Sequence, residues 1–310
     1  MSERVRITDV APRDGLQNES GVIPSGEKAE LVRLLARSGV DEVEVSSFVS
    51  PKWVPQLGDA SEVFALVAGE KPAGMVFSAL VPNERGMAAA LEANERAGAR
   101  VIDKVGVFTA ASETFSERNT NATIAQTLER FRPVVAMARG EGIQVRGYVS
   151  CVIACPFEWA ISPAAVADVS ARLLELGVDE LDLGDTIGRG TPETVEAMLI
   201  DVLERTQLEA VNDLGEPSLT LHLHDTFGGA GACVERALEL GVRSFDGSAG
   251  GLGGCPYASV GDRRAPGNVA TESVVEVVTR LEYATGVDVA ALREAGAFAR
   301  AIVERAGAGS

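Results

Sequence analysis

Two histidines stand one residue apart in the segment "LHLHD", and the sequence contains no others. Because side chains of a β-strand alternate between its two faces, His222 and His224 point the same way if this segment is a strand. A single buried histidine is usually a hydrogen-bonded core residue, whereas a pair on one face beside carboxylates is typical of a metal site. The spacing therefore predicts that His222 and His224 bind a divalent metal ion.

An arginine and an aspartate are adjacent in "APRDGLQNES", directly after the apolar alternation of Val5, Ile7 and Val10. An Arg-Asp pair at the end of a strand is often no more than a surface ion pair. Adjacent residues of a loop need not share a face, however, so Asp14 can bind a metal while Arg13 offers its guanidinium to a substrate oxygen. This interpretation predicts that the metal ion held by Asp14 and the guanidinium of Arg13 both act on one carbonyl-bearing ligand.

Two imidazoles with oxygen ligands favour a six-coordinate ion, Mg²⁺ or Mn²⁺, over zinc. Structural zinc sites prefer thiolates, and the sequence has no Cys-x-x-Cys pair. Cys151 and Cys155 have apolar neighbours and Cys233 falls in a helical pattern, so we expect all three to be structural. Cys255 differs because it follows the glycine-dense "AGGLGG", which predicts a loop that closes over a ligand. The alternative is a turn with an incidental cysteine.

Elements that position these residues repeat along the chain as a helix end, a glycine and a short apolar strand, as in "SGVDEVEVSS" and "LGVDELDLGDT". Eight such strands alternate with helical stretches, which predicts a TIM (β/α)8 barrel in a single domain, 1–310, with one or two extra helices over 285–310. The predicted strands are 4–10, 41–47, 75–81, 101–108, 143–150, 180–185, 219–225 and 243–248. The predicted helices include 26–37, 83–97, 121–139, 163–176, 192–205 and 229–240. An open doubly wound sheet is the alternative, although no Gly-rich phosphate fingerprint follows the first strand.

In a TIM barrel, active sites form where the strands end. The unusual polar residues of this sequence follow that rule: Arg13 and Asp14 after the first strand, Glu44 and Ser47 in the second, Asp185 in the sixth, both histidines in the seventh and Cys255 after the eighth. We therefore expect these side chains to share one end of the barrel.

Bulk properties exclude several classes of function. The net charge is -17 and opposes general binding to nucleic acid or to an anionic membrane surface. No apolar run approaches the roughly 20 residues that span a bilayer, and the polar start "MSERVRITDV" does not resemble a signal peptide. Four cysteines are too few for a disulfide framework, so we expect a reduced protein in the cytoplasm.

The motifs together closely resemble the 3-hydroxy-3-methylglutaryl-CoA lyases, metal-dependent barrels that carry an Arg-Asp motif after the first strand. The resemblance covers nearly the whole chain. Its segments are "APRDGLQNE", "SSFVSPKWVPQ", "RGYVSC", "LGDTIG", "HLHDT", "GLGGCPYA" and "GNVATE".

The resemblance implies a role for each matching residue. Asp14, His222, His224 and Asn268 resemble the metal ligands of the family, Arg13 the residue that stabilises an enolate oxygen, and Cys255 the loop cysteine that supports proton transfer. Glu44 and Asp185 resemble the family's acidic site residues. Gln17, Ser47, Tyr148 and Thr186 resemble polar groups of the substrate pocket, although ordinary strand-end hydrogen bonding is almost as good an explanation for these four.

The implied reaction is cleavage of 3-hydroxy-3-methylglutaryl-CoA to acetyl-CoA and acetoacetate. A tertiary hydroxyl must lose its proton before the carbon-carbon bond breaks, which a metal facilitates, and His222 is our candidate for accepting that proton. The alternatives are a lyase for a bulkier 3-hydroxyglutaryl-CoA, a synthase that condenses acetyl-CoA with a 2-oxo acid, and a metal-binding barrel without turnover. The resemblance also implies a homodimer.

One segment departs from the family. Between Cys255 and Asn268 the chain reads "CPYASVGDRRAPGN", which is longer than the short Gly/Ser connection expected. The extra Arg263 and Arg264 form either a solvated turn or a cationic contact for the phosphates of CoA, and Lys52 is a further candidate for such a contact.

Overall fold

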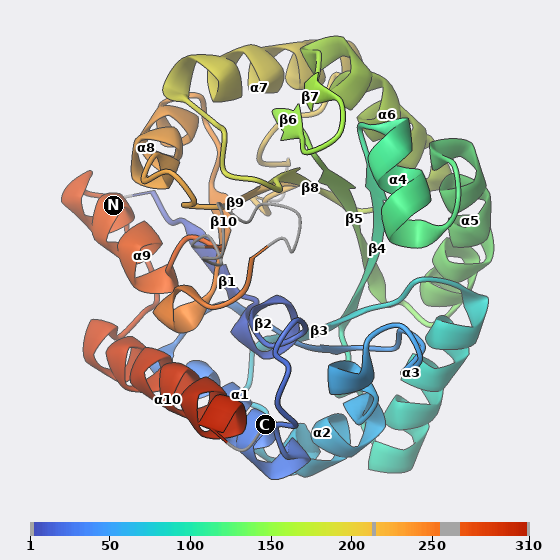
Figure 1. Cartoon of the computed structure of the whole chain (residues 1–310), viewed down its shortest axis with the longest axis vertical. Helices are drawn as coiled ribbons and strands as arrows, with labels where there is room; N and C mark the ends of the chain where they lie inside the picture. The colour runs from blue at the N-terminus through green and yellow to red at the C-terminus, as the bar shows by residue number, and fades with distance from the viewer. Residues whose placement is uncertain (1–2, 213–214, 255–266, 309–310) are drawn as a thin grey trace.

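Eight parallel strands form a closed barrel at the centre of the molecule (Figure 1). The structure, a computed structural model, describes residues 3–212, 215–254 and 267–308, so Cys255, Arg263 and Arg264 lie outside the described residues. Around the barrel the order is β1-β10-β9-β8-β5-β4-β3-β2. The strands are β1 Arg6–Asp9, β2 Glu42–Ser47, β3 Val76–Leu80, β4 Lys104–Ala110, β5 Gln144–Ser150, β8 Glu180–Asp185, β9 Leu219–Leu223 and β10 Ser244–Gly247. The predicted TIM barrel is confirmed.

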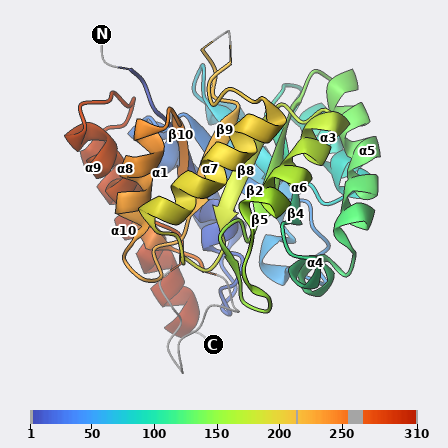
Figure 2. The same cartoon turned by 90° about the horizontal axis from the view of Figure 1, so that it is seen from above.

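Helices form a ring around the barrel, as Figure 1 shows down the axis and Figure 2 from the side. They are α1 Ser25–Ser38, α2 Ala60–Val67, α3 Glu84–Ala97, α4 Glu113–Thr120, α5 Ile124–Gly140, α6 Pro163–Leu176, α7 Pro192–Thr206, α8 Ala230–Glu239, α9 Thr271–Arg280 and α10 Val289–Ala308. The C-terminal helix α10 packs against α1 and lies outside the repeating strand-helix pattern. No helix within the described ranges is long and apolar enough to cross a membrane.

The strands are buried on both faces, yet the two faces differ in chemistry. In β8, "ELDLGD", Leu181 and Leu183 belong to the apolar core, while Glu180 and Asp182 contact charged groups of other strands inside the barrel. This alternation follows from the two-residue period of a strand. The interior of a TIM barrel is usually filled with branched apolar side chains. Here charged residues occupy much of it, so their pairing becomes a structural requirement.

Most sequence predictions of elements agree with the structure to within a few residues. The fourth strand is shifted from the predicted 101–108 to Lys104–Ala110, because residues 101–103 lead into the ladder and the pairing with β5 continues to Ala110. The C-terminal stretch, predicted to form one or two helices, forms the single helix α10. The helices α2, α4 and α9 were not predicted from the sequence. The same is true of a small antiparallel pair in the loop after β5, formed by β6 Ala154–Cys155 and β7 Trp159–Ala160.

Candidate active site and metal centre

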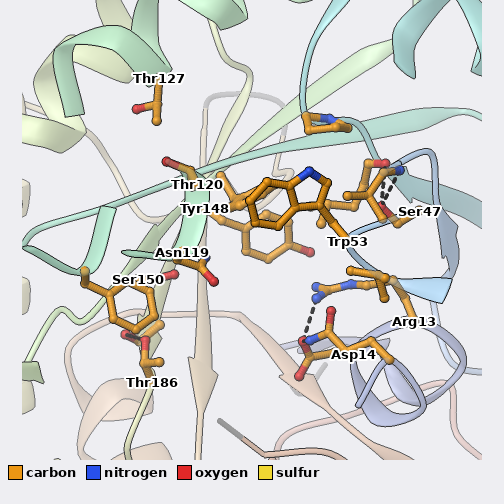
Figure 3. Close-up of a pocket in the computed structure, with 18 of the residues that line it drawn as sticks. Arg13, Asp14, Ser47, Trp53, Asn119, Thr120, Thr127, Tyr148, Ser150 and Thr186 are labelled. Carbon is orange, nitrogen blue, oxygen red and sulfur yellow. Dashed lines mark hydrogen bonds and ion pairs between the residues drawn. The ribbon is translucent and has the colours of Figure 1, made fainter. Parts of the chain in front are cut away.

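A cavity of about 650 Å³ opens where the barrel strands end. Arg13, Asp14, His222 and His224 line one part of it, and Trp53 and Tyr148 lie beside them. Figure 3 shows Arg13 next to Asp14, with Ser150 and Thr186 toward another part of the lining. The structure therefore brings the predicted Arg-Asp pair and the histidine pair together.

A tight helical turn, Ala11–Gly15, presents Arg13 and Asp14 to the cavity. The backbone N–H groups of Arg13, Asp14 and Gly15 all donate to the carbonyl oxygen of Val10, at 3.2, 2.8 and 3.1 Å. Below the turn, the Asp9 carboxylate accepts from the backbone N–H of Ala11 at 2.9 Å. With its backbone fixed in this way, the turn aims two adjacent side chains at one site.

Arg13 is almost fully buried and lies between two carboxylates. Its guanidinium is 2.5 Å from Asp14 Oδ1 and 2.5 Å from Glu44 Oε2. The Tyr148 hydroxyl donates to the other oxygen of Glu44 at 3.2 Å, and the Tyr148 ring lies 5.8 Å from the guanidinium carbon. Glu44 therefore orients the arginine rather than facing the cavity freely, which fixes the direction of its remaining N–H groups.

The two histidines face each other, with 3.3 Å between their Nε2 atoms. One ligand atom each from Asp14, His222 and His224 lies within 4.8 Å of the others. Asn268 joins this group, because its Nδ2 donates to Asp14 Oδ2 at 2.7 Å and it bridges to His224 through the backbone. These four residues are the predicted metal ligands, and the structure places them in one cluster.

Electrostatics keep this cluster ready to bind a cation. Burial would raise the pKa of the Asp14 carboxyl, but Arg13 and the histidines lower it to about 2. Burial, reinforced by His222, lowers the pKa of His224 to about 3. Asp14 is thus a carboxylate and His224 a neutral imidazole near neutral pH, the forms in which both residues bind metals.

Two buried polar atoms without hydrogen-bond partners bear on whether a metal ion fits this cluster. Asn268 Oδ1 and His224 Nδ1 are buried and have no hydrogen-bond partner among the residues that the structure describes. Buried polar atoms are normally paired, so such atoms call for an explanation, of which an ion is one. An amide oxygen, a carboxylate and two imidazole nitrogens form a donor set suited to Mg²⁺ or Mn²⁺. The residues therefore fit the predicted divalent ion.

A glycine of the loop that precedes Cys255 packs directly on this cluster. Gly253 has a φ of 97°, and a Cβ there would lie 2.6 Å from Asn268 Nδ2 and 3.0 Å from the backbone oxygen of Asp14. Only glycine allows such an approach without strain. The described part of the glycine-dense loop therefore reaches the metal ligands, and the cysteine that follows it, Cys255, lies outside the described residues.

The predicted pocket residues occupy different positions. Gln17 Nε2 donates to Asp14 Oδ1 at 2.6 Å, and Ser47 donates to the carbonyl oxygen of Leu80 at 3.2 Å. Thr186 lines the cavity and accepts from the backbone N–H of Cys151 at 2.8 Å. Strand-end hydrogen bonding thus explains part of the contacts of Ser47 and Thr186, while Gln17 directly supports the proposed ligand Asp14.

Four of the predicted residues that the structure describes are not part of the cavity lining: Glu44 and Asn268, which contact the lining residues Arg13 and Asp14, and Asp185 and Lys52. The Asp185 carboxylate accepts from the backbone N–H groups of Arg189 and Gly190, at 3.1 and 2.6 Å, and so shapes its own loop. Burial, partly offset by those N–H groups, raises its pKa to about 6. Lys52 is exposed, whereas its neighbour Trp53 lines the cavity.

Two arginines that the sequence analysis did not select line the cavity on the side of α4 and α5. Arg118 lies over the Phe157 ring at 4.2 Å, and Arg130 donates to the carbonyl oxygens of Thr120 and Asn121 at 3.2 and 3.4 Å. Arg118 belongs to α4 and Arg130 to α5, so both come from helices and not from the strand ends where the predicted site residues lie. The polar segment "ERNTNAT" contains Arg118 and could have indicated it, whereas Arg130 lies outside this segment, within the helical pattern that follows.

Comparison with known proteins places this geometry in a family. The HMGL-like family model matches residues 4–299. Mitochondrial hydroxymethylglutaryl-CoA lyase of Bos taurus is 45% identical over 96% of this chain and 85% of its own. A Pseudomonas aeruginosa relative named 3-hydroxy-3-isohexenylglutaryl-CoA/hydroxy-methylglutaryl-CoA lyase is 44% identical over 96% of this chain and 92% of its own.

Solved structures agree with these relatives. The HMG-CoA lyase of Brucella melitensis superposes with a TM-score of 0.88 at 46% identity, covering 98% of this chain and 100% of the other. An HMG-CoA lyase of Acinetobacter baumannii, solved with coenzyme A and 3-methylmalate, gives a TM-score of 0.85 at 33% identity, covering 97% and 92% of the two chains. The chain therefore belongs to the HMGL-like family, and its relatives are hydroxymethylglutaryl-CoA lyases.

Proposed function

We propose that the protein cleaves 3-hydroxy-3-methylglutaryl-CoA to acetyl-CoA and acetoacetate with the help of Mg²⁺ or Mn²⁺. The observation that carries this proposal is the cluster of Asp14, His222, His224 and Asn268, in which the first three residues line one cavity together with Arg13. Relatives at 43–45% identity bear the name of this lyase, which favours it over the condensing synthase.

The metal ligands would be Asp14, His222, His224 and Asn268. When bound there, the ion supplies Lewis acidity that lowers the pKa of a tertiary hydroxyl. His222 lines the cavity among these residues, and it is our candidate for accepting the hydroxyl proton while its Nε2 is not bound to the ion, since a metal-bound nitrogen has no lone pair for a proton. Proton transfer to a positioned imidazole is the usual form of general base catalysis.

Arg13 would stabilise the negative charge that develops on the thioester oxygen as the carbon-carbon bond breaks. Its contacts with Glu44 and Asp14 fix the guanidinium before substrate arrives, and preorganised donors of this kind are the main source of transition-state stabilisation in many enzymes. Cys255 remains our candidate for supplying the proton that converts the enolate to acetyl-CoA, in the loop that begins at the described Gly253 and Gly254.

Binding of an anionic acyl-CoA by a chain of net charge -17 needs a local cationic surface. Arg118 and Arg130 supply one at the cavity lining, which adds them to the predicted Lys52, Arg263 and Arg264 as candidates for contact with the CoA phosphates. A relative solved with coenzyme A is compatible with this class of substrate. From the resemblance we further propose a homodimer, for which light scattering should give twice the chain mass of 32.4 kDa.

The test uses purified protein that is stripped of metal and then resupplied with Mg²⁺ or Mn²⁺. With 3-hydroxy-3-methylglutaryl-CoA, we expect acetyl-CoA and acetoacetate in equal amounts, measured by mass spectrometry, only after metal is returned. A parallel reaction with acetyl-CoA and a 2-oxo acid tests for condensation. Folded, metal-loaded protein that fails to cleave the substrate would refute the proposed function.

A further inference from the structure

One carboxylate inside the barrel contacts a proposed metal ligand from below. Asp246 of β10 is the register partner of His222 on the neighbouring strand β9, so both side chains point into the barrel. Asp246 Oδ2 lies 3.3 Å from Nδ1 of His222, while Nε2 of the same ring faces His224. The two nitrogens of this imidazole therefore have different partners, one carboxylate and one proposed metal ligand.

Asp246 is itself held firmly. Its second oxygen, Oδ1, accepts from Nη1 of Arg146 at 3.2 Å, and Arg146 also contacts Glu42 and Glu180 at 3.1 and 2.9 Å. Both Asp246 and Arg146 are about 1% exposed, so water cannot take over these contacts. The charged network inside the barrel thus fixes the position of the oxygen that faces His222.

We propose that Asp246 is a positioning residue: its carboxylate accepts a hydrogen bond from Nδ1–H of His222 and thereby holds the ring in the tautomer whose Nε2 lone pair points at the metal site. The physical reason is that a neutral imidazole carries one proton, and an acceptor at Nδ1 leaves Nε2 free to bind a metal. This inference rests on the proposed function, because it assigns His222 as a metal ligand.

Asp182 of β8 provides a matched control. It is as deeply buried as Asp246, its Oδ2 lies 3.5 Å from the same Arg146 nitrogen, and one of its oxygens lies within 4.8 Å of ligand atoms of both Asp246 and His222. Among the described residues, its carboxyl hydrogen-bonds to Arg146, and the contact with Nδ1 of the imidazole belongs to Asp246. If the buried network merely supports the fold, Asp182→Asn and Asp246→Asn should have similar effects; if Asp246 sets the tautomer, only Asp246→Asn should change the metal site.

The experiment combines metal affinity with the state of the imidazole. Asparagine at 246 keeps the size of the side chain but can turn an N–H group toward Nδ1, which favours the opposite tautomer. We expect the Mn²⁺ affinity of Asp246→Asn, measured by calorimetry on metal-free protein, to fall roughly 10- to 100-fold, the usual effect of removing a partner of a metal-bound histidine. We expect kcat to fall while KM for the acyl-CoA stays constant, and Asp182→Asn to match the wild type in both.

Nitrogen-15 spectra give a readout without any metal or turnover, and they are simple because the chain has two histidines. In metal-free wild type at alkaline pH, His222 should carry its proton on Nδ1, and this should hold even if the protein binds no Mn²⁺, so failure of the proposed function is distinguishable. Wild-type His222 protonated on Nε2 would overturn the inference, whether or not Asp246→Asn folds. Equal losses of affinity in Asp182→Asn and Asp246→Asn would also overturn it.

Discussion

The two ends of the barrel interior both bury charged residues, but they satisfy them differently. At the N-terminal ends of the strands, Lys104 contacts Glu42 and Glu180 at 2.7 Å each, and Arg146 contacts Glu180 at 2.9 Å. We call this group of four residues the paired cluster. Every member touches an opposite charge, which is the condition under which buried ions are tolerated.

At the C-terminal ends, the metal cluster of Asp14, His222, His224 and Asn268 is incomplete within the described part of the chain, where Asn268 Oδ1 and His224 Nδ1 have no partner. Glu42 Oε1 and Arg146 Nε of the paired cluster also lack a described hydrogen-bond partner, so the two clusters differ in their charges: the paired cluster contains its own cations, whereas the metal cluster gathers ligand atoms without a cation of its own between them. A buried cluster in which opposite charges balance can support the fold, whereas ligand atoms gathered without a cation are suited to binding one. This difference can be tested at each end separately.

The largest effect should come from removing a carboxylate of the metal cluster. We expect Asp14→Ala to lower kcat/KM by at least roughly 10⁴-fold and to abolish measurable Mn²⁺ binding, because metal ions contribute several kcal/mol to such transition states. Steady-state kinetics and calorimetry measure the two effects. Asp103→Ala, which removes a carboxylate bonded to Lys71 and to the backbone of Phe77, is the control and should keep both. An active Asp14→Ala enzyme would break the comparison.

A substitution in the paired cluster should lower the stability of the protein and leave its metal affinity unchanged. Lys104→Met leaves Glu42 and Glu180 without the ammonium group between them, and breaking a buried pair in this way costs about 3–5 kcal/mol of the free energy of unfolding. Chemical denaturation measures the loss, while the Mn²⁺ affinity of the folded variant should equal that of the wild type.

A suitable control is Arg96→Met, because Arg96 forms an exposed pair with Glu92 within one helix. Exposed pairs of this type contribute little, so this variant should unfold like the wild type. If Lys104→Met were no less stable than Arg96→Met, the paired cluster would not support the fold as we infer.

Much of the fold followed from local patterns in the sequence. The glycines at the ends of the repeated helices, Gly39, Gly98 and Gly177, have φ values of 79°, 64° and 92°, which confirms the predicted left-handed helix caps. Strand alternation also placed both histidines on one face. The β6–β7 pair escaped prediction because strands of two residues carry no periodicity, and α4 because only Phe115 and Ser116 of its residues are buried.

The sequence predicted those parts of the site that depend on one strand at a time, and not the contacts between side chains of different strands. The sequence indicated Asp14, His222 and His224 by their types and their places at strand ends. The contact between Asp246 and His222 depends on the register between two strands, and the position of Arg146 depends on the closure of the barrel around it. No pattern within one strand reports either, so the partners of the histidines required the structure.

A smaller loss of activity is expected from Arg13→Lys, which distinguishes the positive charge of Arg13 from the fixed position of its guanidinium. Lysine keeps the positive charge but cannot contact Glu44 and Asp14 through a planar fork, so the group would no longer be fixed before the reaction. We expect Arg13→Lys to lower kcat roughly 100-fold with little change in KM, comparable to the loss of one preorganised donor. Arg118→Lys, at the cavity lining, should instead change KM. A change in KM alone for Arg13→Lys would assign Arg13 to substrate binding.

Asp9 sharpens the comparison because it is as buried as the paired cluster but contacts only neutral donors. Its oxygens accept from the backbone N–H groups of Ala11 and Ala249 and from the Thr271 hydroxyl, at 2.9, 3.0 and 2.6 Å. Burial raises its pKa from 3.8 to about 7 despite these bonds, whereas Arg146 and Lys104 outweigh burial at Glu180 and lower the pKa there. Neutral donors therefore compensate a buried carboxylate less completely than opposite charges do.

The raised pKa of Asp9 gives stability a defined pH dependence. Between about pH 4 and pH 7 the folded protein holds a proton on Asp9 that the unfolded chain releases, so the contribution of this group to stability falls as pH rises through that window. The slope should approach 1.4 kcal/mol per pH unit, roughly the value for one proton, and level off above about pH 7. Denaturation curves of wild type and Asp9→Asn across this range measure it, and Asp9→Asn should lack the slope, because an amide does not titrate. A variant with an unchanged slope would show that another group titrates in this window and that the N–H donors alone keep Asp9 ionised.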